Sequence, residues 1–157
     1  MWRREGAGEL YTYLPPGIDA NTKVCSVPPE SDCNDTFGQS VGRGSFSFTP
    51  GTRTTIGQRV RLNHPGAENG ELELFVNGKS MFSVTGLVLA NTDAGRIRGI
   101  QMQSFFGGEC ARAARCLVVP RGADGFMRAT GNDASWASPK DQNVFFGDFT
   151  VAITEKL

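Results

Sequence analysis

The chain consists of short segments in which apolar and polar residues alternate, separated by turns that contain glycine, proline and asparagine. Alternation with a period of two predicts β-strands that bury one face, and no segment shows the sustained period of an amphipathic helix. Val60 and Leu62 are expected to face inward, and Arg59 and Arg61 outward. The predicted strands are residues 9–14, 45–48, 58–62, 71–76, 79–84, 96–103 and 143–153.

The turn between strands 71–76 and 79–84 is the clearest local signal. Asn77 and Gly78 form a two-residue connection that favours a positive φ at both positions, as a type I′ hairpin requires. The chain has 20 glycines and 8 prolines in 157 residues. Short strands and many turns of this kind are typical of an all-β protein. We therefore predict an antiparallel β-sandwich that forms one domain over residues 1–157.

The charge balance narrows the classes of partner. The chain has 16 Lys+Arg and 16 Asp+Glu residues, so its net charge is zero, which argues against a strongly basic nucleic-acid binder. No apolar run approaches the roughly 18 residues of a membrane span. A single histidine excludes a multi-histidine zinc site, and no other cluster of metal ligands is evident. The sequence predicts a monomer without metal or cofactor, and with neither nucleic acid nor membrane as partner.

Cysteine usage indicates the compartment. The cysteines lie in two predicted loops, residues 18–39 and 109–135, at Cys25, Cys33, Cys110 and Cys116. Four cysteines allow three pairings, and the two local ones are simplest because each disulfide would close its own loop. A glycosylation sequon at residues 34–36 also predicts an oxidising, extracellular compartment. Residues 1–6 lack the apolar stretch of a signal peptide, so secretion would need a preceding segment.

Two tyrosines on one predicted strand are the candidate chemical groups. With a two-residue period, Tyr11 and Tyr13 project from the same face, roughly 7 Å apart along the strand. On a solvated face, two phenols can hydrogen-bond a sugar and transfer protons. The alternative is a half-buried strand that uses tyrosine for its β-propensity.

A series of ordered motifs adds to this picture. Residues 1–13 read Met-Trp-Arg-Arg-Glu-Gly-Ala-Gly-Glu-Leu-Tyr-Thr-Tyr, and they resemble the central segment of polysaccharide lyase family 14-type domains. The other segments that resemble the family, in chain order, are residues 42–46, 60–63, 70–78, 98–108 and 136–155. The resemblance implies a concanavalin-like β-jelly roll that cleaves alginate or glucuronan by β-elimination.

The resemblance also implies roles for individual residues. The family's catalytic set is a Lys, a Ser-x-Arg and a Tyr-x-Tyr, and only the last maps here, onto Tyr11 and Tyr13. The Lys and the Ser-x-Arg of relatives would precede residue 1, so we expect a jelly roll truncated at its N-terminus. Without those cations, the two tyrosines are expected to be ordinary phenols, able to bind sugar but poor as bases.

Five further polar residues are candidates to contact the substrate. Glu9 shares the tyrosine face, Gln101 and Gln103 share a face of their predicted strand, and Arg43 and Arg98 carry the charge that substrate carboxylates require. For each, the alternative is a polar side chain on an exposed sheet or in a salt bridge. The predicted function is a lyase acting on an acidic polysaccharide; the alternatives are a non-catalytic carbohydrate-binding jelly roll and a structural cell-surface domain.

Overall fold

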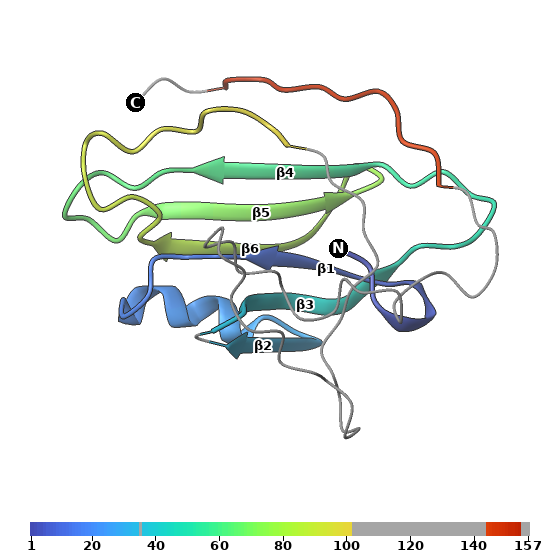
Figure 1. The fold of residues 1–157 in the computed structure, drawn as a ribbon, viewed down its shortest axis with the longest axis horizontal. Helices are drawn as coiled ribbons and strands as arrows, with labels where there is room; N and C mark the ends of the chain where they lie inside the picture. Colours follow the sequence, from blue (N-terminus) through green and yellow to red (C-terminus); the bar gives the residue numbers. More distant parts are fainter. Residues whose placement is uncertain (35, 102–143, 155–157) are drawn as a thin grey trace, which may run out of the picture. The chain divides into compact units, whose positions relative to one another are not determined.

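The computed structural model describes residues 1–34, 36–101 and 144–154. It divides the chain into two compact units, Met1–Gly99 and Ile100–Leu157. Every helix and strand assigned within the described residues belongs to the first unit (Figure 1). A single domain over the whole chain stays a prediction.

The first sheet joins the N-terminal strand to a hairpin. Its strand order is β1-β3-β2, and both pairings are antiparallel. The alternation that predicted a strand at residues 9–14 is confirmed by β1, although the strand begins two residues earlier. The elements of this part of the chain are η1 (Arg4–Gly6), β1 (Ala7–Thr12), η2 (Asp19–Ser26), β2 (Glu30–Asn34) and β3 (Gly38–Ser47).

The second sheet is an antiparallel meander in the order β4-β5-β6. Its turn confirms the predicted hairpin, because Asn77 has a φ of 50° and Gly78 a φ of 79°. Val60 lies opposite the buried Leu72, as the alternation predicts, yet it is 38% exposed because β4 is an outer strand of this sheet. The strands are β4 (Ile56–Arg61), β5 (Gly70–Val76) and β6 (Lys79–Leu87).

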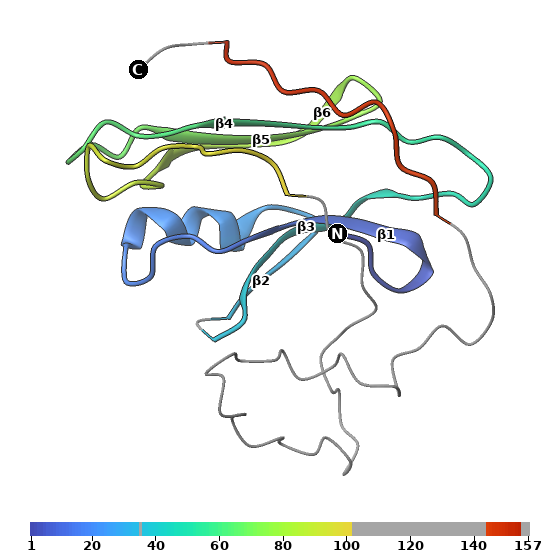
Figure 2. The same ribbon diagram turned by 45° about the horizontal axis from the view of Figure 1, so that its top comes forward.

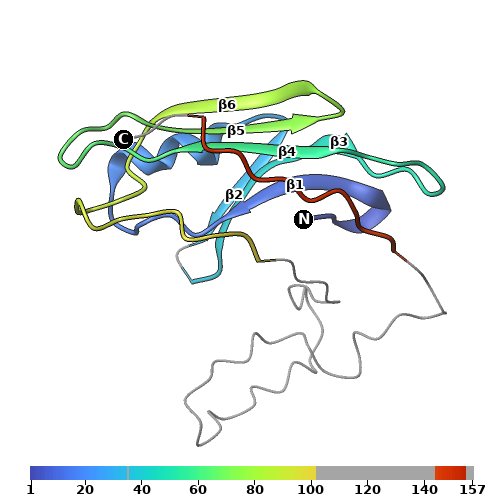
Figure 3. The same ribbon diagram turned by 90° about the horizontal axis from the view of Figure 1, so that it is seen from above.

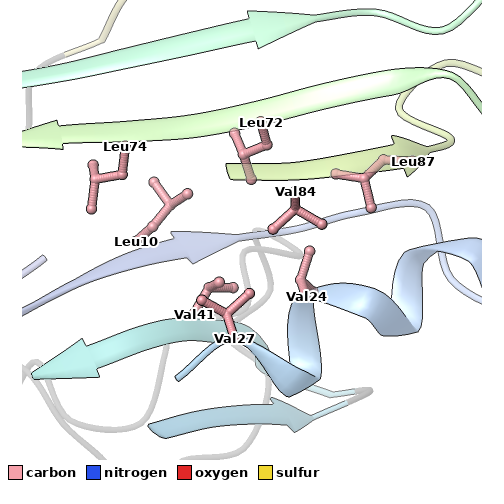
Figure 4. Close-up of a cluster of buried hydrophobic side chains, with 8 residues drawn as sticks. All are labelled: Leu10, Val24, Val27, Val41, Leu72, Leu74, Val84 and Leu87. Carbon is pink, nitrogen blue, oxygen red and sulfur yellow. The ribbon is translucent and has the colours of Figure 1, made fainter. Parts of the chain in front are cut away.

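A hydrophobic core lies between the two sheets. Figures 2 and 3 show the sheets as two layers, with η2 beside the first sheet and facing the second. Side chains from β1, β3 and η2 point toward those of β5 and β6 (Figure 4). This arrangement confirms the predicted antiparallel sandwich. The core cluster comprises Leu10, Val24, Val27, Val41, Leu72, Leu74, Val84 and Leu87.

Two buried asparagines fasten the segment that follows β6. The Asn21 amide nitrogen donates to the Val88 carbonyl at 2.9 Å, and its oxygen accepts from the Val88 amide at 2.9 Å. Asn63 likewise donates to the Ala90 carbonyl and accepts from the Leu89 and Ala90 amides. These side chains supply the hydrogen bonds that this irregular backbone would otherwise lack.

Three sequence expectations are corrected. Residues 18–39, predicted as a loop, contain η2 and β2 as well as the start of β3. The described residues of two predicted strands, 96–101 and 144–153, carry no strand assignment. Alternation alone does not make a strand, because a strand also needs a neighbour that accepts its ladder of hydrogen bonds.

A disulfide joins Cys25 of η2 to Cys33 of β2, one of the two local pairings considered. It tethers the short helix to the outer strand of the first sheet. Cys110 and Cys116, with the predicted loop 109–135, lie outside the described residues. Within the described residues, no helix is long and apolar enough to cross a membrane.

Candidate functional site

The face of the first sheet that points away from the core is polar. Leu10 enters the core, so the neighbouring residues Glu9 and Tyr11 point to the opposite face. Tyr11 lies directly opposite Ser40 of β3, which in turn lies opposite Asp32 of β2. This polar face, defined by these side chains together with Tyr13, Arg43 and Glu30, is the candidate site.

The two predicted tyrosines form a pair on this face. The ring centroids of Tyr11 and Tyr13 are 5.4 Å apart, and the rings meet edge to face at 73°. Tyr13 is 78% exposed, whereas Tyr11 is partly buried. A sugar that approached the sheet would therefore meet Tyr13 first and Tyr11 beneath it.

The Tyr11 hydroxyl acts as a hydrogen-bond donor. It donates a short hydrogen bond to the backbone carbonyl of Phe37, in the β2–β3 turn. Burial, and then the neighbouring Tyr13, raise the pKa of Tyr11 above its ordinary value, and the nearby Arg3 only partly opposes them. The neutral phenol is therefore favoured at physiological pH, even though the Arg3 guanidinium lies over the Tyr11 ring.

Glu9 anchors a network of charges beside the tyrosines. This side chain is fully buried, with the residue 1% exposed. Its Oε1 accepts a hydrogen bond from Nε of Arg3 at 2.7 Å and forms an ion pair with Nη2 of the same residue at 2.6 Å. Its Oε2 accepts from the Ser40 hydroxyl at 2.6 Å and from Nε of Arg43 at 2.9 Å. Both carboxylate oxygens are therefore fully occupied by donors.

The pKa of the Glu9 carboxyl reflects two opposed effects. Burial is the largest single influence and raises the pKa, because it disfavours the charged form. Hydrogen bonds from Arg3, Ser40 and Arg43 together outweigh burial, so the pKa lies below its ordinary value. A carboxylate that is ionised, saturated and inaccessible has no proton to exchange with substrate, so Glu9 organises its neighbours.

A tight chain reversal places Arg3 over the tyrosine face. Glu5 and Gly6 have φ values of 61° and 80°, and the Arg3 amide donates to the Ala7 carbonyl at 2.6 Å. Arg3 thereby lies opposite Ala7, on the face that Glu9 and Tyr11 share. Its guanidinium carbon is 5.6 Å from the centroid of the Tyr11 ring, a cation–π distance.

Of the other residues predicted to contact the substrate, the structure places one on the polar face and others away from it. Arg43 lies on the polar face, where Nη1 donates to Glu30 at 3.2 Å and Nη2 to Ser40 at 3.0 Å. Arg98 is exposed in a segment without regular structure, and Gln101 is an exposed residue of the second unit. Gln103 lies outside the described residues. Glu9, Arg43, Tyr11 and Tyr13 are thus brought together, and their roles toward substrate remain predictions.

Arg3 and Ser40 are members of this network that were not predicted from the sequence. The available signal for Arg3 was Gly6, because glycine is a residue that marks turns and it stands just before the tyrosine strand. Recognising that turn would have placed Arg3 opposite Ala7 and hence on the tyrosine face. Ser40 carried no comparable signal, because its strand was predicted to begin at residue 45.

A cavity of about 580 Å³ adjoins the exposed end of the tyrosine strand. Tyr13, Pro15 and Pro16 line it together with Asn21 and Gln39, and all of its described lining residues are uncharged. Such a surface offers apolar and amide contacts, but no charged partner for a carboxylate. Within the described residues, no group of three or more His, Cys, Asp or Glu side chains is placed to hold a metal ion.

Comparison with solved structures defines the class of the protein. The crystal structure of the marine PL-14 alginate lyase from Aplysia kurodai matches with a TM-score of 0.58 and 30% sequence identity, over 69% of this chain. The fold is therefore a β-sandwich of the jelly-roll class, as predicted. A comparison with curated proteins found no significant match.

The family follows from the sequence itself. Polysaccharide lyase 14 matches residues 1–115, so the chain belongs to the polysaccharide lyase 14 family. The matched region includes the polar face with Tyr11, Tyr13, Glu9 and Arg43. The chain spans 42% of the length of the Aplysia alginate lyase chain.

Proposed function

We propose that this protein is a polysaccharide lyase that cleaves an acidic, uronate-containing polysaccharide such as alginate or glucuronan by β-elimination. The observation that carries the proposal is the Tyr11–Tyr13 pair beside the arginine–carboxylate network, in a chain of the polysaccharide lyase 14 family. The similar Aplysia protein is an alginate lyase, which supports the same reaction class.

The reaction determines which groups are needed. A base removes the proton at C5 of the uronate, the C4–O bond breaks, a C4=C5 double bond forms, and an acid protonates the departing oxygen. The carboxylate attached to C5 must be stabilised as negative charge develops on it, which a cation or preorganised donors can do. Tyrosines and arginines on one sheet face provide donors and positive charge together.

The protonation state of Tyr11 favours one role in this scheme. Its hydroxyl carries a proton and already acts as a donor, toward the Phe37 carbonyl. A neutral phenol can orient the sugar or protonate the departing oxygen, but it cannot remove the C5 proton until it has lost its own. We therefore assign Tyr11 to proton donation or substrate orientation, with Tyr13 as the exposed partner that contacts the sugar.

The test is the appearance of unsaturated uronate ends. The protein is incubated with alginate or polyglucuronate, and the ultraviolet absorbance of the C4=C5 product is followed. Replacing Tyr11→Phe or Tyr13→Phe removes one hydroxyl while keeping the ring. We expect Tyr11→Phe to lower the rate by about 100-fold or more, the usual contribution of general acid–base catalysis. Tyr13→Phe removes a contact with the sugar and should lower the rate by about tenfold.

The control is His64→Gln, which alters an exposed residue in the loop between β4 and β5 and should leave the rate unchanged. Absence of unsaturated product from every uronan supplied to the wild-type protein would overturn the assignment as a lyase. Wild-type rates in both tyrosine variants would instead overturn the roles of Tyr11 and Tyr13.

A second candidate function is carbohydrate binding without catalysis. The observation that favours it is the pKa of Tyr11, which is raised, whereas a catalytic base needs a lowered one. Binding of alginate with no release of unsaturated ends would support this function over the lyase.

In either case we infer an extracellular protein, because the Cys25–Cys33 disulfide indicates an oxidising compartment. We also propose that the protein is a monomer.

A further inference from the structure

The two arginines that grip Glu9 differ in what they leave available. All three nitrogens of the Arg43 guanidinium donate to protein acceptors, namely Glu9, Glu30 and Ser40. Arg3 uses Nε and Nη2 on Glu9, whereas its Nη1 makes no hydrogen bond with any residue that the structure describes. Both side chains are 28% exposed. Arg3 therefore retains a donor edge that a ligand can reach.

The surroundings of the two arginines also differ in charge. Arg43 faces β2, which carries the exposed carboxylates of Glu30 and Asp32. These acids offset its positive charge and would repel a second carboxylate. Arg3 lies beyond β1, opposite Ala7, so β1 and β3 separate its backbone from β2, although both guanidiniums reach Glu9. An anionic sugar would meet less repulsion at Arg3.

Glu9 fixes the orientation of the Arg3 guanidinium. Two donors on one carboxylate oxygen hold its plane, and the cation lies over the ring of Tyr11. An arginine that is already immobilised loses little conformational entropy when it binds a ligand. The geometry thus presents a fixed, partly satisfied cation next to the candidate proton donor.

We propose that Arg3, held across the Tyr11 ring by the buried Glu9 carboxylate, is the site that binds a uronate carboxylate of the polysaccharide. This inference rests on the proposed function and names a residue that recognises the acid group of its substrate. In this role Arg3 hydrogen-bonds the carboxylate through Nη1, and Glu9 is a positioning residue. The sugar ring bound there would lie against the phenols of Tyr11 and Tyr13.

The experiment compares binding of two polymers, one with a carboxylate at C6 of each sugar and one with a hydroxymethyl group there. Affinity for alginate and for carboxyl-reduced alginate is measured for the wild-type protein, Arg3→Gln and Arg3→Lys. We expect Arg3→Gln to weaken alginate binding by about tenfold or more, the value of a hydrogen bond between charged groups, while binding of the reduced polymer stays the same. Arg3→Lys keeps the charge without the planar fork, so its affinity should fall between the two.

Two further variants separate recognition from folding. In Arg3→Gln/Glu9→Gln the buried carboxylate loses its charge together with Arg3, and Arg43 keeps its ion pair with the exposed Glu30. We expect this folded double variant to show the same loss of alginate affinity. Arg59→Gln alters an arginine that pairs with Glu71 and Glu73 on the second sheet, and it should bind alginate like the wild type.

The outcomes distinguish this inference from the proposed function. If the wild-type protein neither binds nor cleaves any uronan, the proposed function fails and this inference fails with it. If the wild type binds alginate and Arg3→Gln binds it equally well, only the inference is overturned. Equal weakening toward both polymers would also overturn it, because that result indicates a structural role.

The tyrosine content of the chain permits an independent readout. The chain has 2 tyrosines. A Tyr13→Phe background therefore leaves Tyr11 as the single phenol, whose ionisation can be followed by ultraviolet absorbance. The charged side chains near it are Arg3 and Glu9. Adding Arg3→Gln should raise the Tyr11 pKa, because the cation favours phenolate. An unchanged titration would contradict the placement of Arg3 over the ring.

Discussion

At the scale of single residues, Glu9 links the candidate site to stability. Its folded pKa lies below the ordinary value, so the unfolded chain binds the Glu9 proton more readily than the folded one. The stabilisation is fully present above the unfolded pKa of about 4.3 and is lost as the pH falls through the folded pKa. As the pH falls, the ion pairs between Glu9 and Arg3 should therefore weaken before the apolar core unfolds.

We expect Glu9→Gln to lower the free energy of unfolding by about 2 kcal/mol at neutral pH, because hydrogen bonds to a charged group are lost. The variant should also lose part of the pH dependence below about pH 4.3. Denaturant unfolding at several pH values measures both effects. Glu68→Gln, in an exposed loop, is the matched control; an identical pH profile for Glu9→Gln and wild type would contradict the assignment.

At the same scale, the sequence predicted some site residues and missed others for a physical reason. Tyr11, Tyr13 and Glu9 share the predicted strand 9–14, so a common face for them follows from the two-residue period alone, although β1 itself ends at Thr12. Arg3 reaches that face only through a chain reversal, and Ser40 only through strand pairing. Contacts that depend on tertiary pairing are not encoded in the local pattern.

At the scale of elements, the strands that alternate clearly were the predictable ones. β5 and β6 have apolar residues on one face and a two-residue turn between them. β5 was predicted to within one residue, and β6 was predicted with its correct start but three residues too short. β2 reads Glu-Ser-Asp-Cys-Asn and has no apolar alternation. It is a strand because β3 pairs with it and the disulfide tethers it to η2, so its own residues gave no signal.

Contact between the two layers limits what can be placed on β3. Gly42 has a φ of 62°, and a Cβ atom there would lie 2.6 Å from the ring of Phe82 on β6. We expect Gly42→Ala to destabilise the protein by about 3 kcal/mol, from backbone strain of roughly 1–2 kcal/mol together with overpacking. Thermal or denaturant unfolding measures the loss.

The control for that variant is Gly51→Ala. Gly51 has a φ of 75°, but a Cβ atom added there would meet nothing within 4 Å, so its substitution should cost only the backbone strain, about 1 kcal/mol. Replacing Phe82→Leu should recover part of the excess in Gly42→Ala. Equal destabilisation by the two alanine variants would show that the ring contact does not limit the packing.

At the scale of the whole molecule, neutrality and an acidic substrate are compatible. The net charge is zero, so the protein has no overall charge with which to attract a polyanion from a distance. Recognition must then come from charges arranged locally, as on the polar face of the first sheet. The acids of β2 confine the available positive charge to the β1 side of that face.

The family match and the compact units do not share a boundary. Polysaccharide lyase 14 matches residues 1–115, whereas the first unit ends at Gly99. The family sequence therefore continues into the second unit, beyond the last assigned strand. A single domain over residues 1–157 stays a prediction.

The buried asparagines have a consequence for the order of folding. The β4-β5-β6 meander is closed by short connections, whereas the Asn21–Val88 hydrogen bonds join residues separated by 67 positions. Because closing a long loop costs more entropy than closing a hairpin, we expect the meander to form before this bond. The asparagine contact should then be absent from the folding transition state.

Stopped-flow kinetics can test this order. Asn21→Ala should speed unfolding by about 30-fold, if the lost bonds contribute about 2 kcal/mol, and should leave the folding rate nearly unchanged. Gly78→Ala, in the tight hairpin turn, should instead slow folding. If Asn21→Ala slows folding as well, the long-range contact forms early. The expected result would show that Asn21 controls the rate of unfolding rather than the rate of folding.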